Sequence, residues 1–475
     1  MSVKHKTLIV SKAFLFVCFV VPFLALPRVW GDSSVAGTQA CPSPEWLRRG
    51  VIYEIFPRDF SRAGNLGGVT AKLDELQNLG VNILWLMPIQ PIGKKSRAGE
   101  FGSPYSIRDY YAIDPEYGTA ADFKGLVTGA HQRGMKVIMD LVANHTAWDS
   151  VMMAHPEFYK HDSQGKIISP MPAWADVAAL DYRNPQLRRH MISMCKYWIQ
   201  TYDIDGFRCD SAAMVPTDFW EQARRELMEI KPDIIMLAEA SKPELLTNAF
   251  NIDYSWPLLG AMDDVLVKGE PASEVRRSWN ESRAQFPEGA LHLRISDDHD
   301  EVRAVNRYGF DAALAASALV FTLDGVPLIY NGMEIGDVHE SSGGALFKKI
   351  NIRWQTPQRP QWRATYHDLI ELRRQYPALC DSTVDWVGNT DEKHIVSFRR
   401  ADDKDELLVL INLSAQPVDG RVAIDTADGF KRVEISGVDD SGVAQLPAFH
   451  LSGYEWRIFH RPLPLQPPVA ERVSK

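Results

Sequence analysis

Short apolar runs rich in β-branched residues alternate along the chain with longer segments that have helical periodicity. This alternation is typical of βαβ units that build a parallel sheet. Counting a weaker run near 251–256, there are eight such strands, the number that closes a (β/α)8 barrel. No Gly-rich dinucleotide fingerprint follows the first run, which argues against an open dinucleotide-binding sheet. We expect the strands at 51–57, 81–88, 136–145, 205–210, 234–239, 251–256, 291–300 and 326–332.

Two departures from this rhythm divide the chain further. The stretch 146–182 is rich in His, Pro, Ser and Gly and is too long for a plain loop, so it predicts a small inserted subdomain after the third strand. Beyond residue 380, alternating runs at 394–401 and 406–414 are joined by a turn-like Asp-Asp-Lys-Asp and predict antiparallel strands. We therefore predict an α/β fold with a (β/α)8 TIM barrel over 46–380, the insertion at 146–182, a C-terminal antiparallel β-sandwich over 381–461 and a Pro-rich tail over 462–475.

The first 31 residues have the pattern of a secretory signal peptide. A Lys-bearing start precedes an apolar run from Ala13 to Leu26, and cleavage is expected after Gly31. An uncleaved membrane anchor is the alternative, but this run is shorter than the roughly 20 residues that span a bilayer. We expect a secreted or periplasmic protein that does not associate with a membrane once the signal is removed.

Net charge argues against a nucleic-acid partner, and the cysteine count argues against a disulfide framework. The chain has 52 Lys and Arg residues against 61 Asp and Glu residues, a net charge of -9, so it has no surplus positive charge to neutralise nucleic-acid phosphates. After the signal, Cys41, Cys195, Cys209 and Cys380 are too few for a disulfide framework. A single disulfide bridge stays an open alternative, although buried free thiols are favoured.

Reactive side chains follow the expected strand ends, which in a (β/α) barrel all lie at one rim. Several carboxylates and two histidines stand there, and no His or Cys cluster has metal-binding spacing. This set suits acid/base and nucleophilic chemistry at an acetal. Glycoside hydrolysis needs one carboxylate that attacks and a second that donates a proton. The residues at these positions are Asp140, His145, Arg208, Asp210, Glu239, His299 and Asp300.

Arg208 precedes Asp210 by two residues, so both side chains point to the same face of the strand. We expect the charge of Arg208 to keep Asp210 ionised, as a nucleophile requires. Glu239 is expected to keep its proton among apolar and acidic neighbours. Asp140 and Arg208 either form a buried structural ion pair or belong to the substrate-binding surface.

These segments resemble the conserved regions of glycoside hydrolase family 13, the α-amylase family. The matching motifs are Asp140-Leu-Val-Ala-Asn-His145, Gly206-Phe-Arg-Cys-Asp210, Ala238-Glu-Ala240, Asp298-His-Asp300 and Gly325 to Glu334, with Gly64 to Gly68 and Pro104 to Tyr111 completing the order. The match runs from Val51 to Arg374.

The resemblance implies a role for each matched residue. Asp210 is the implied nucleophile, Glu239 the general acid/base, and Asp300 the carboxylate that grips hydroxyls of the reacting sugar. The resemblance also implies that His145 and His299 bind this sugar, that Tyr105 stacks beneath it, and that Asp140 shapes the site as the partner of Arg208.

Departures from the family pattern affect the site. Asp298 stands where the family usually has Asn. Ala179 replaces an acid often used in calcium binding, and Ala213-Met214 replace a common Lys-His pair. We expect no metal or other cofactor; calcium stays an open alternative, with Asn144 as the single retained candidate ligand.

The resemblance implies a retaining α-glycosidase that hydrolyses α-1,4-glucosidic bonds in starch-like glucans or maltooligosaccharides. A family transglycosylase or isomerising enzyme would use the same residues. A non-catalytic glycan-binding protein is the third alternative, although such relatives normally lose one of the acids. The sequence leaves open the preference for α-1,4 or α-1,6 bonds, endo or exo action, chain length and oligomeric state.

Overall fold

The computed structural model describes residues 35–381, 383–438 and 445–464. The predicted signal peptide lies outside these residues, as does most of the predicted Pro-rich tail. Both stay predictions.

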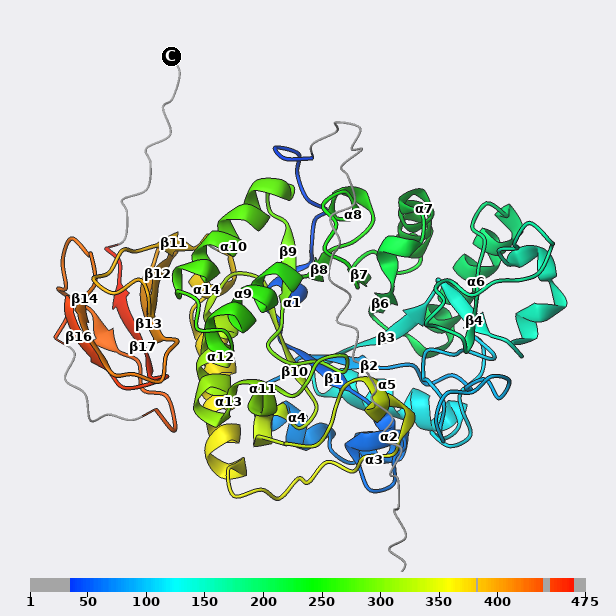
Figure 1. Cartoon of the computed structure of the whole chain (residues 1–475), viewed down its shortest axis with the longest axis horizontal. Coiled ribbons are helices and arrows are strands. Elements are labelled where there is room, and N and C mark those ends of the chain that lie inside the picture. Colours follow the sequence, from blue (N-terminus) through cyan, green and yellow to red (C-terminus); the bar gives the residue numbers. More distant parts are fainter. Residues whose placement is uncertain (1–34, 382, 439–444, 465–475) are drawn as a thin grey trace, which may run out of the picture. The chain divides into compact units, whose positions relative to one another are not determined.

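Eight parallel strands form a closed barrel (Figure 1). Each strand pairs with the next barrel strand along the chain, and the last pairs with the first, where Ile52 lies opposite Leu328. All eight predicted strands are present, including the weak one. They are β1 (Ile52–Ile55), β2 (Ile83–Leu86), β3 (Lys136–Val142), β6 (Gly206–Asp210), β7 (Ile235–Ala238), β8 (Ile252–Tyr254), β9 (Leu291–Arg294) and β10 (Val326–Tyr330).

Helices connect the strands, and their apolar patterns explain their positions. In α4 (Leu73–Leu79) the leucines at both ends and Leu76 are buried, and Gly80 caps the helix in the left-handed conformation, φ 100°. Helix α12 (Phe310–Thr322) is buried on almost every side because it contacts β10, another helix and the C-terminal sheet. The other helices are α1 (Glu45–Arg48), α2 (Pro57–Phe60), α3 (Leu66–Thr70), α5 (Ala120–Gln132), α6 (Pro185–Tyr202), α7 (Thr217–Met228), α8 (Leu245–Asn248), α9 (Trp256–Leu266), α10 (Ser273–Gln285), α11 (Ala304–Tyr308), α13 (Arg359–Gln375) and α14 (Ala378–Asp381).

The polar segment after β3 is an insertion, as predicted. It begins with β4 (His145–Ala147), which pairs antiparallel with β5 (Val177–Ala179). Two short 3-10 turns, Val151–Ala154 and Pro156–Phe158, lie between them. The pairing of His145 with Ala179 holds the insertion against the carboxyl end of β3.

The C-terminal part is an antiparallel β-sandwich, as predicted. Its central strand, β13 (Asp405–Asn412), presents Leu408 and Leu410 to a separate apolar core. Alternate residues on the other face, such as Val409, belong to the large core that also contains the barrel. One sheet has the order β11 (Asp385–Trp386), β12 (Ile395–Ala401), β13, β17 (Trp456–Pro462) and β15 (Lys431–Arg432), and the other pairs β14 (Val418–Arg421) with β16 (Ala448–Leu451).

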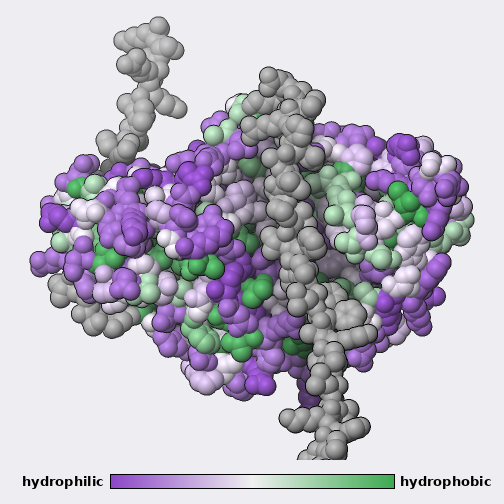
Figure 2. Space-filling model, viewed as in Figure 1, coloured by the Kyte–Doolittle hydropathy of each residue, from purple (hydrophilic) through white to green (hydrophobic). Residues whose placement is uncertain are grey.

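The surface in Figure 2 is mainly hydrophilic, with apolar residues dispersed over it. Over the described ranges, no helix combines the length and apolarity needed to cross a bilayer. The cysteines at 41, 195, 209 and 380 are all buried and unpaired, which confirms the expectation of free thiols.

Candidate active site

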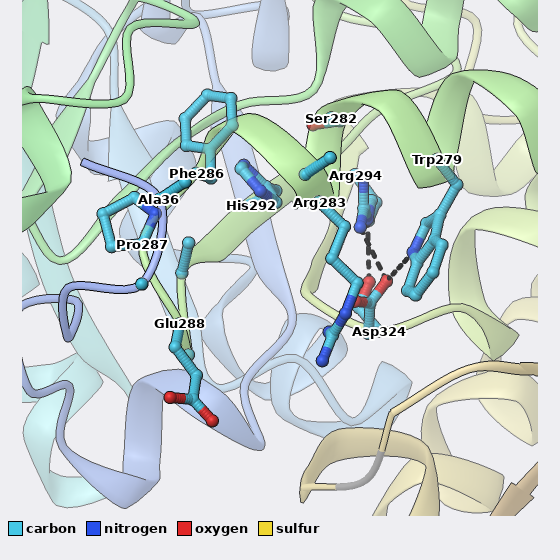
Figure 3. Close-up of a pocket in the computed structure, with 14 residues that line it drawn as sticks. Ala36, Trp279, Ser282, Arg283, Phe286, Pro287, Glu288, His292, Arg294 and Asp324 are labelled. Atoms are coloured by element: carbon cyan, nitrogen blue, oxygen red, sulfur yellow. Dashed lines mark hydrogen bonds and ion pairs between the residues drawn. The ribbon is translucent and has the colours of Figure 1, made fainter. Parts of the chain in front are cut away.

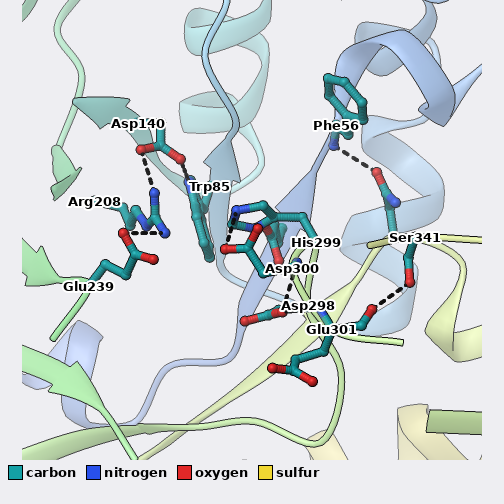
Figure 4. Close-up of polar contacts among 12 residues, drawn as sticks. Phe56, Trp85, Asp140, Arg208, Glu239, Asp298, His299, Asp300, Glu301 and Ser341 are labelled. Carbon is teal, nitrogen blue, oxygen red and sulfur yellow. Dashed lines mark hydrogen bonds and ion pairs between the residues drawn. The ribbon is translucent and has the colours of Figure 1, made fainter. Parts of the chain in front are cut away.

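The carboxyl ends of β3, β6 and β7 bring three predicted acids to one guanidinium, and Figure 4 shows two of them, Asp140 and Glu239, beside Arg208. Arg208 on β6 lies opposite Asp140 on β3. Its Nη1 is 2.9 Å from Asp140 Oδ1 and 3.4 Å from Asp210 Oδ1, and its Nη2 is 3.2 Å from Glu239 Oε2. One cation therefore holds carboxylates from three neighbouring strands.

Aromatic rings surround this guanidinium. The Arg208 Cζ atom lies 5.1 Å from the ring centroid of Trp85, 5.7 Å from that of Tyr105 and 5.8 Å from that of Tyr254. A planar, weakly hydrated cation suits such a setting better than a lysine ammonium would. The rings fix the orientation of the side chain and hence of the acids that it binds.

His299, which follows β9, links a second set of acids to the same centre. Its Nδ1 is 2.5 Å from Glu54 Oε1, and its Nε2 is 2.7 Å from the Tyr105 hydroxyl and 3.2 Å from Asp300 Oδ2. Burial disfavours the charged ring, but the charges of Asp300 and Glu54 outweigh it and raise the pKa of His299 well above its ordinary value. His299 is therefore an imidazolium whose two N–H groups both have acceptors.

The pKa values of the acids differ from the sequence-based expectation. Burial, followed by the charge of Glu239, raises the pKa of Asp210 well above its ordinary value, although Arg208 acts in the opposite direction. Burial likewise raises the pKa of Asp140 to about 6 despite its ion pair with Arg208. The charge of Arg208 lowers the pKa of Asp210, as predicted, but burial and the neighbouring acids outweigh it, so Arg208 alone does not keep Asp210 ionised in this arrangement.

Asp300 and Glu239 have different surroundings from Asp210. Burial would raise the pKa of Asp300, but the adjacent His299 imidazolium outweighs it and lowers that pKa. The expectation that Glu239 lies among apolar and acidic neighbours is only partly met, because Glu239 also contacts a hydrogen-bond donor and a cation. Its Oε2 accepts a hydrogen bond from the Ser211 backbone N–H at 2.6 Å, in addition to the Arg208 contact.

Exposure separates the predicted residues into two groups. The side chains of Asp210, Glu239 and Asp300 are 11%, 20% and 42% exposed. Asp140 has no exposed side-chain surface, so its assignment as a substrate-binding residue is corrected to that of a buried ion-pair partner of Arg208. Asp210, Glu239 and Asp300 thus keep some accessible side-chain surface, and they rest on a buried layer of charged and aromatic side chains.

The remaining predicted residues lie close to this buried layer of charged and aromatic side chains. His145 on β4 is buried, and burial lowers its pKa to about 4, so the ring is neutral at pH 7. Its ring centroid lies 5.6 Å from that of Trp174, which the insertion supplies. The Tyr105 ring stacks on His299 with centroids 5.5 Å apart, and its hydroxyl donates to Asp140 Oδ2 at 3.2 Å. Sugar contacts of His145, Tyr105 and His299 stay predictions.

Glu54 and Trp85 were missed by the sequence reasoning. Glu54 lies on β1 and is completely buried. Trp85 lies on β2 and donates from Nε1 to Asp140 Oδ2 at 3.2 Å. A charged residue inside the apolar run 51–57 was the signal that could have identified Glu54.

Asn144 is the single candidate calcium ligand that the sequence retains, and calcium binding there stays an open alternative. Calcium prefers six to eight oxygen ligands. The Asn144 Nδ2 lies 3.4 Å from His145 Nδ1 and 3.8 Å from Met214 Sδ, and Ala179 supplies no side-chain oxygen. Within the described ranges, no group of three or more His, Cys, Asp or Glu residues could hold a metal ion.

A cavity of about 330 Å³ lies at the opposite, amino-terminal ends of β9 and β10 (Figure 3). Two of its charged groups form an ion pair: Arg294 Nη2 is 2.6 Å from Asp324 Oδ1, and Trp279 Nε1 donates to the same oxygen at 2.9 Å. Catalytic groups of (β/α) barrels lie at the carboxyl ends of the strands. The acids around Arg208 therefore remain the candidate active site.

Known protein families and structures match the barrel region. Residues 26–165 and 173–345 match the family described as alpha amylase, catalytic domain. Alpha-amylase MalA of Haloarcula japonica is 27% identical over 411 residues, which cover 82% of this chain but 59% of that protein.

Two solved structures are similar to the fold. An alpha-amylase from Lactobacillus plantarum has 31% identity and a TM-score of 0.78, covering 87% of this chain and 99% of its own. A noncanonic maltogenic alpha-amylase, AmyB from Thermotoga neapolitana, has 28% identity and a TM-score of 0.79, covering 88% of this chain and 100% of its own. Because the family match spans more than half of the residues, the chain belongs to the alpha-amylase family of glycoside hydrolases.

Proposed function

We propose that this protein is a retaining α-glycosidase that hydrolyses α-1,4-glucosidic bonds in starch-like glucans or maltooligosaccharides. The observation that carries the proposal is the convergence of Asp210, Glu239 and Asp300 on one buried guanidinium and one buried imidazole: Asp210 and Glu239 contact Arg208, and Asp300 contacts His299. The names of similar proteins, an alpha-amylase and a maltogenic alpha-amylase, support the substrate class.

The reaction proceeds in two displacements at the anomeric carbon. In the first, a carboxylate oxygen of Asp210 bonds to this carbon while the glycosidic C–O bond breaks and Glu239 gives its proton to the departing oxygen. In the second, Glu239 takes a proton from water, the water oxygen bonds to the carbon, and the bond to Asp210 breaks. Two inversions leave the α configuration unchanged.

The hydrogen bonds of Glu239 assign its proton-transfer atom. Oε2 accepts from the Ser211 N–H and from Arg208, so Oε1 is the oxygen available to carry the proton. Attack requires an ionised Asp210, and departure of the leaving oxygen requires a proton on Glu239. These two acids, on adjacent strands, therefore need opposite protonation states when the sugar is bound.

Asp300 binds the reacting sugar in this proposal. The His299 imidazolium keeps the pKa of Asp300 below its ordinary value, so the carboxylate is ionised across the working pH range. An ionised acceptor makes stronger hydrogen bonds to sugar hydroxyls than a neutral one does. Its exposed side chain is available for these bonds.

Product analysis tests the proposal. The purified protein is incubated with maltoheptaose, and products and their anomeric form are followed over time. Early α-anomeric short maltooligosaccharides are expected. Early β-anomeric products would contradict the retaining mechanism, longer or non-reducing products would indicate transglycosylation, and binding without consumption would indicate a glycan-binding protein.

The Asp210→Asn variant tests the assignment of the nucleophile. It should fold, as judged by circular dichroism, and should lose turnover. A matched control is Asp218→Asn, which changes an exposed acid of α7 that pairs with Arg188, and which should keep full activity. Activity retained by Asp210→Asn would remove Asp210 from the mechanism.

We also propose that the protein is exported, on the strength of the sequence pattern in its first 31 residues. Fractionation of the producing cells, with N-terminal sequencing of the purified protein, tests this. A mature N-terminus close to Asp32 outside the cytoplasm supports export. A full-length protein confined to the cytoplasm contradicts it.

A further inference from the structure

Asp298 is a buried acid that the proposed reaction does not use. It precedes His299 and Asp300 in the segment after β9, and it has no exposed surface (Figure 4). Its Oδ1 accepts hydrogen bonds from the backbone N–H groups of Asp300, at 2.9 Å, and of Glu301, at 3.0 Å. This single oxygen therefore fixes the backbone that carries the proposed sugar-binding carboxylate.

The other carboxyl oxygen is in a different situation. Asp298 Oδ2 is buried and has no hydrogen-bond partner among the described residues. The nearest cation, His299, directs one N–H to Glu54 and the other to Tyr105 and Asp300. An ionised Asp298 would therefore leave negative charge on an unpaired buried atom beside two other acids, which is strongly unfavourable.

We infer that Asp298 is a positioning residue for Asp300 that works as a neutral carboxylic acid, with Oδ1 accepting two backbone N–H groups and Oδ2 carrying a proton. In this form it has one acceptor and one donor, as the amide of Asn does. Glu54, whose Oε2 is also buried without a hydrogen-bond partner among the described residues, is close enough for its charge to act on Asp298, and a proton on Asp298 Oδ2 lowers the repulsion between the two acids.

The charges that face Asp298 support the neutral form. They come from β1 and β8 and from its own segment: Glu54, Tyr254, His299, Asp300 and Glu301. Burial is the main cause that raises the pKa of Asp298 well above its ordinary value, and the three acids add to it against His299.

The pH dependence of stability tests the protonation state. An Asp that stays protonated in the folded protein but ionises in the unfolded chain lowers stability as pH rises above about 4, because unfolding then releases a proton. The effect reaches about tenfold in the unfolding equilibrium constant per pH unit until the pKa of the folded state is reached. The asparagine in the Asp298→Asn variant cannot titrate. The Tm of this variant minus the Tm of the wild type should therefore increase steadily from pH 5 to pH 8.

A difference between Asp298→Asn and wild type that is constant or shrinks over this range would overturn the inference. Asp218→Asn is the matched control. Its hydrogen bond from Arg188 lowers the pKa of Asp218, so this acid is ionised in both states above pH 5 and its difference from wild type should be flat.

Kinetics test the positioning role, which rests on the proposed function of Asp300. At pH 6, Asp298→Ala removes the acceptor and should lower kcat/KM at least about tenfold, mainly through KM, whereas Asp298→Asn should restore it to within about threefold of wild type. Equal activity of the two variants would show that Oδ1 does not position Asp300.

The stability series and the kinetic comparison test the inference independently of one another. The stability series uses no substrate, so it reports on Asp298 even if every glucan proves inert. If Asp298→Ala does not fold, recovery of both folding and KM in Asp298→Asn still supports the amide-like role, and a poorly binding Asp298→Asn contradicts it.

Discussion

Replacement of Arg208 by Met should destabilise the protein in a pH-dependent way. The change removes the cation that contacts Asp140, Asp210 and Glu239 and leaves a side chain of similar length among the rings of Trp85 and Tyr105. Breaking a buried ion pair costs about 3–5 kcal/mol. With an unfolding entropy of roughly 2 cal/mol/K per residue over about 440 residues, this lowers Tm by about 3–6 °C near pH 7.

The sign of the pH effect follows from the acids left behind. Arg208 lowers the pKa of Asp140, which is about 6 with it present, and also acts to lower the pKa of Asp210. Without Arg208 both values rise, and a carboxyl group whose pKa is higher in the folded state costs stability as pH increases through that range. The deficit in Tm should therefore be smallest at pH 5 and largest at pH 8.

Activity should change in the same direction. The proposed nucleophile must be ionised, so the acidic limb of the kcat/KM profile should move to higher pH in Arg208→Met. Differential scanning fluorimetry and initial rates on maltoheptaose from pH 4 to 9 measure both effects.

Arg373→Met provides a matched control. Arg373 is also buried, but its hydrogen bonds go to backbone carbonyls, including those of Phe321 and Gly325. This variant should lose stability by an amount that does not change with pH and should keep the acidic limb in place. A pH-independent deficit in Arg208→Met, or an unmoved limb, would refute the reasoning.

Two further predictions concern the histidine and the metal. Glu54→Gln removes one of the charges that raise the pKa of His299, so the ring should lose its proton at lower pH, and KM should rise about two- to tenfold with a smaller change in kcat; an unchanged KM up to pH 8 would contradict this. Because Ala179 stands where the family often has an acidic calcium ligand, excess EDTA should leave both Tm and activity unchanged, and a fall in Tm that added calcium reverses would show a metal site.

The sequence was sufficient to predict the barrel because its strands are apolar, short and separated by helical periods. Even β8, which has only three residues, was visible as a weak run near 251–256, and counting it gave the eight strands that a closed barrel needs. The expected run 291–300 was too long. Strand β9 ends at Arg294, after which the chain turns so that Asp298 can accept the N–H groups that follow it.

The site was predictable in its residues but not in its charges. Position at a strand end was enough to select Asp210 and Glu239. The sequence could not show that one Arg208 serves three acids, because that depends on distances between strands. It also gave no reason to connect Glu54 on the first strand with His299, since their contact appears only when the barrel closes.

The two faces of β13 have a consequence for how the protein loses its structure. Leu408 and Leu410 belong to the core of the sandwich, whereas Leu407, Val409 and Ile411 belong to the core shared with the barrel. A strand whose neighbouring residues are buried in two cores cannot leave one of them without disturbing the other. The C-terminal region is thus not an independent domain. A chain shortened before Asp405 would expose apolar surface on the barrel. Heating the intact enzyme should unfold both regions in a single cooperative step.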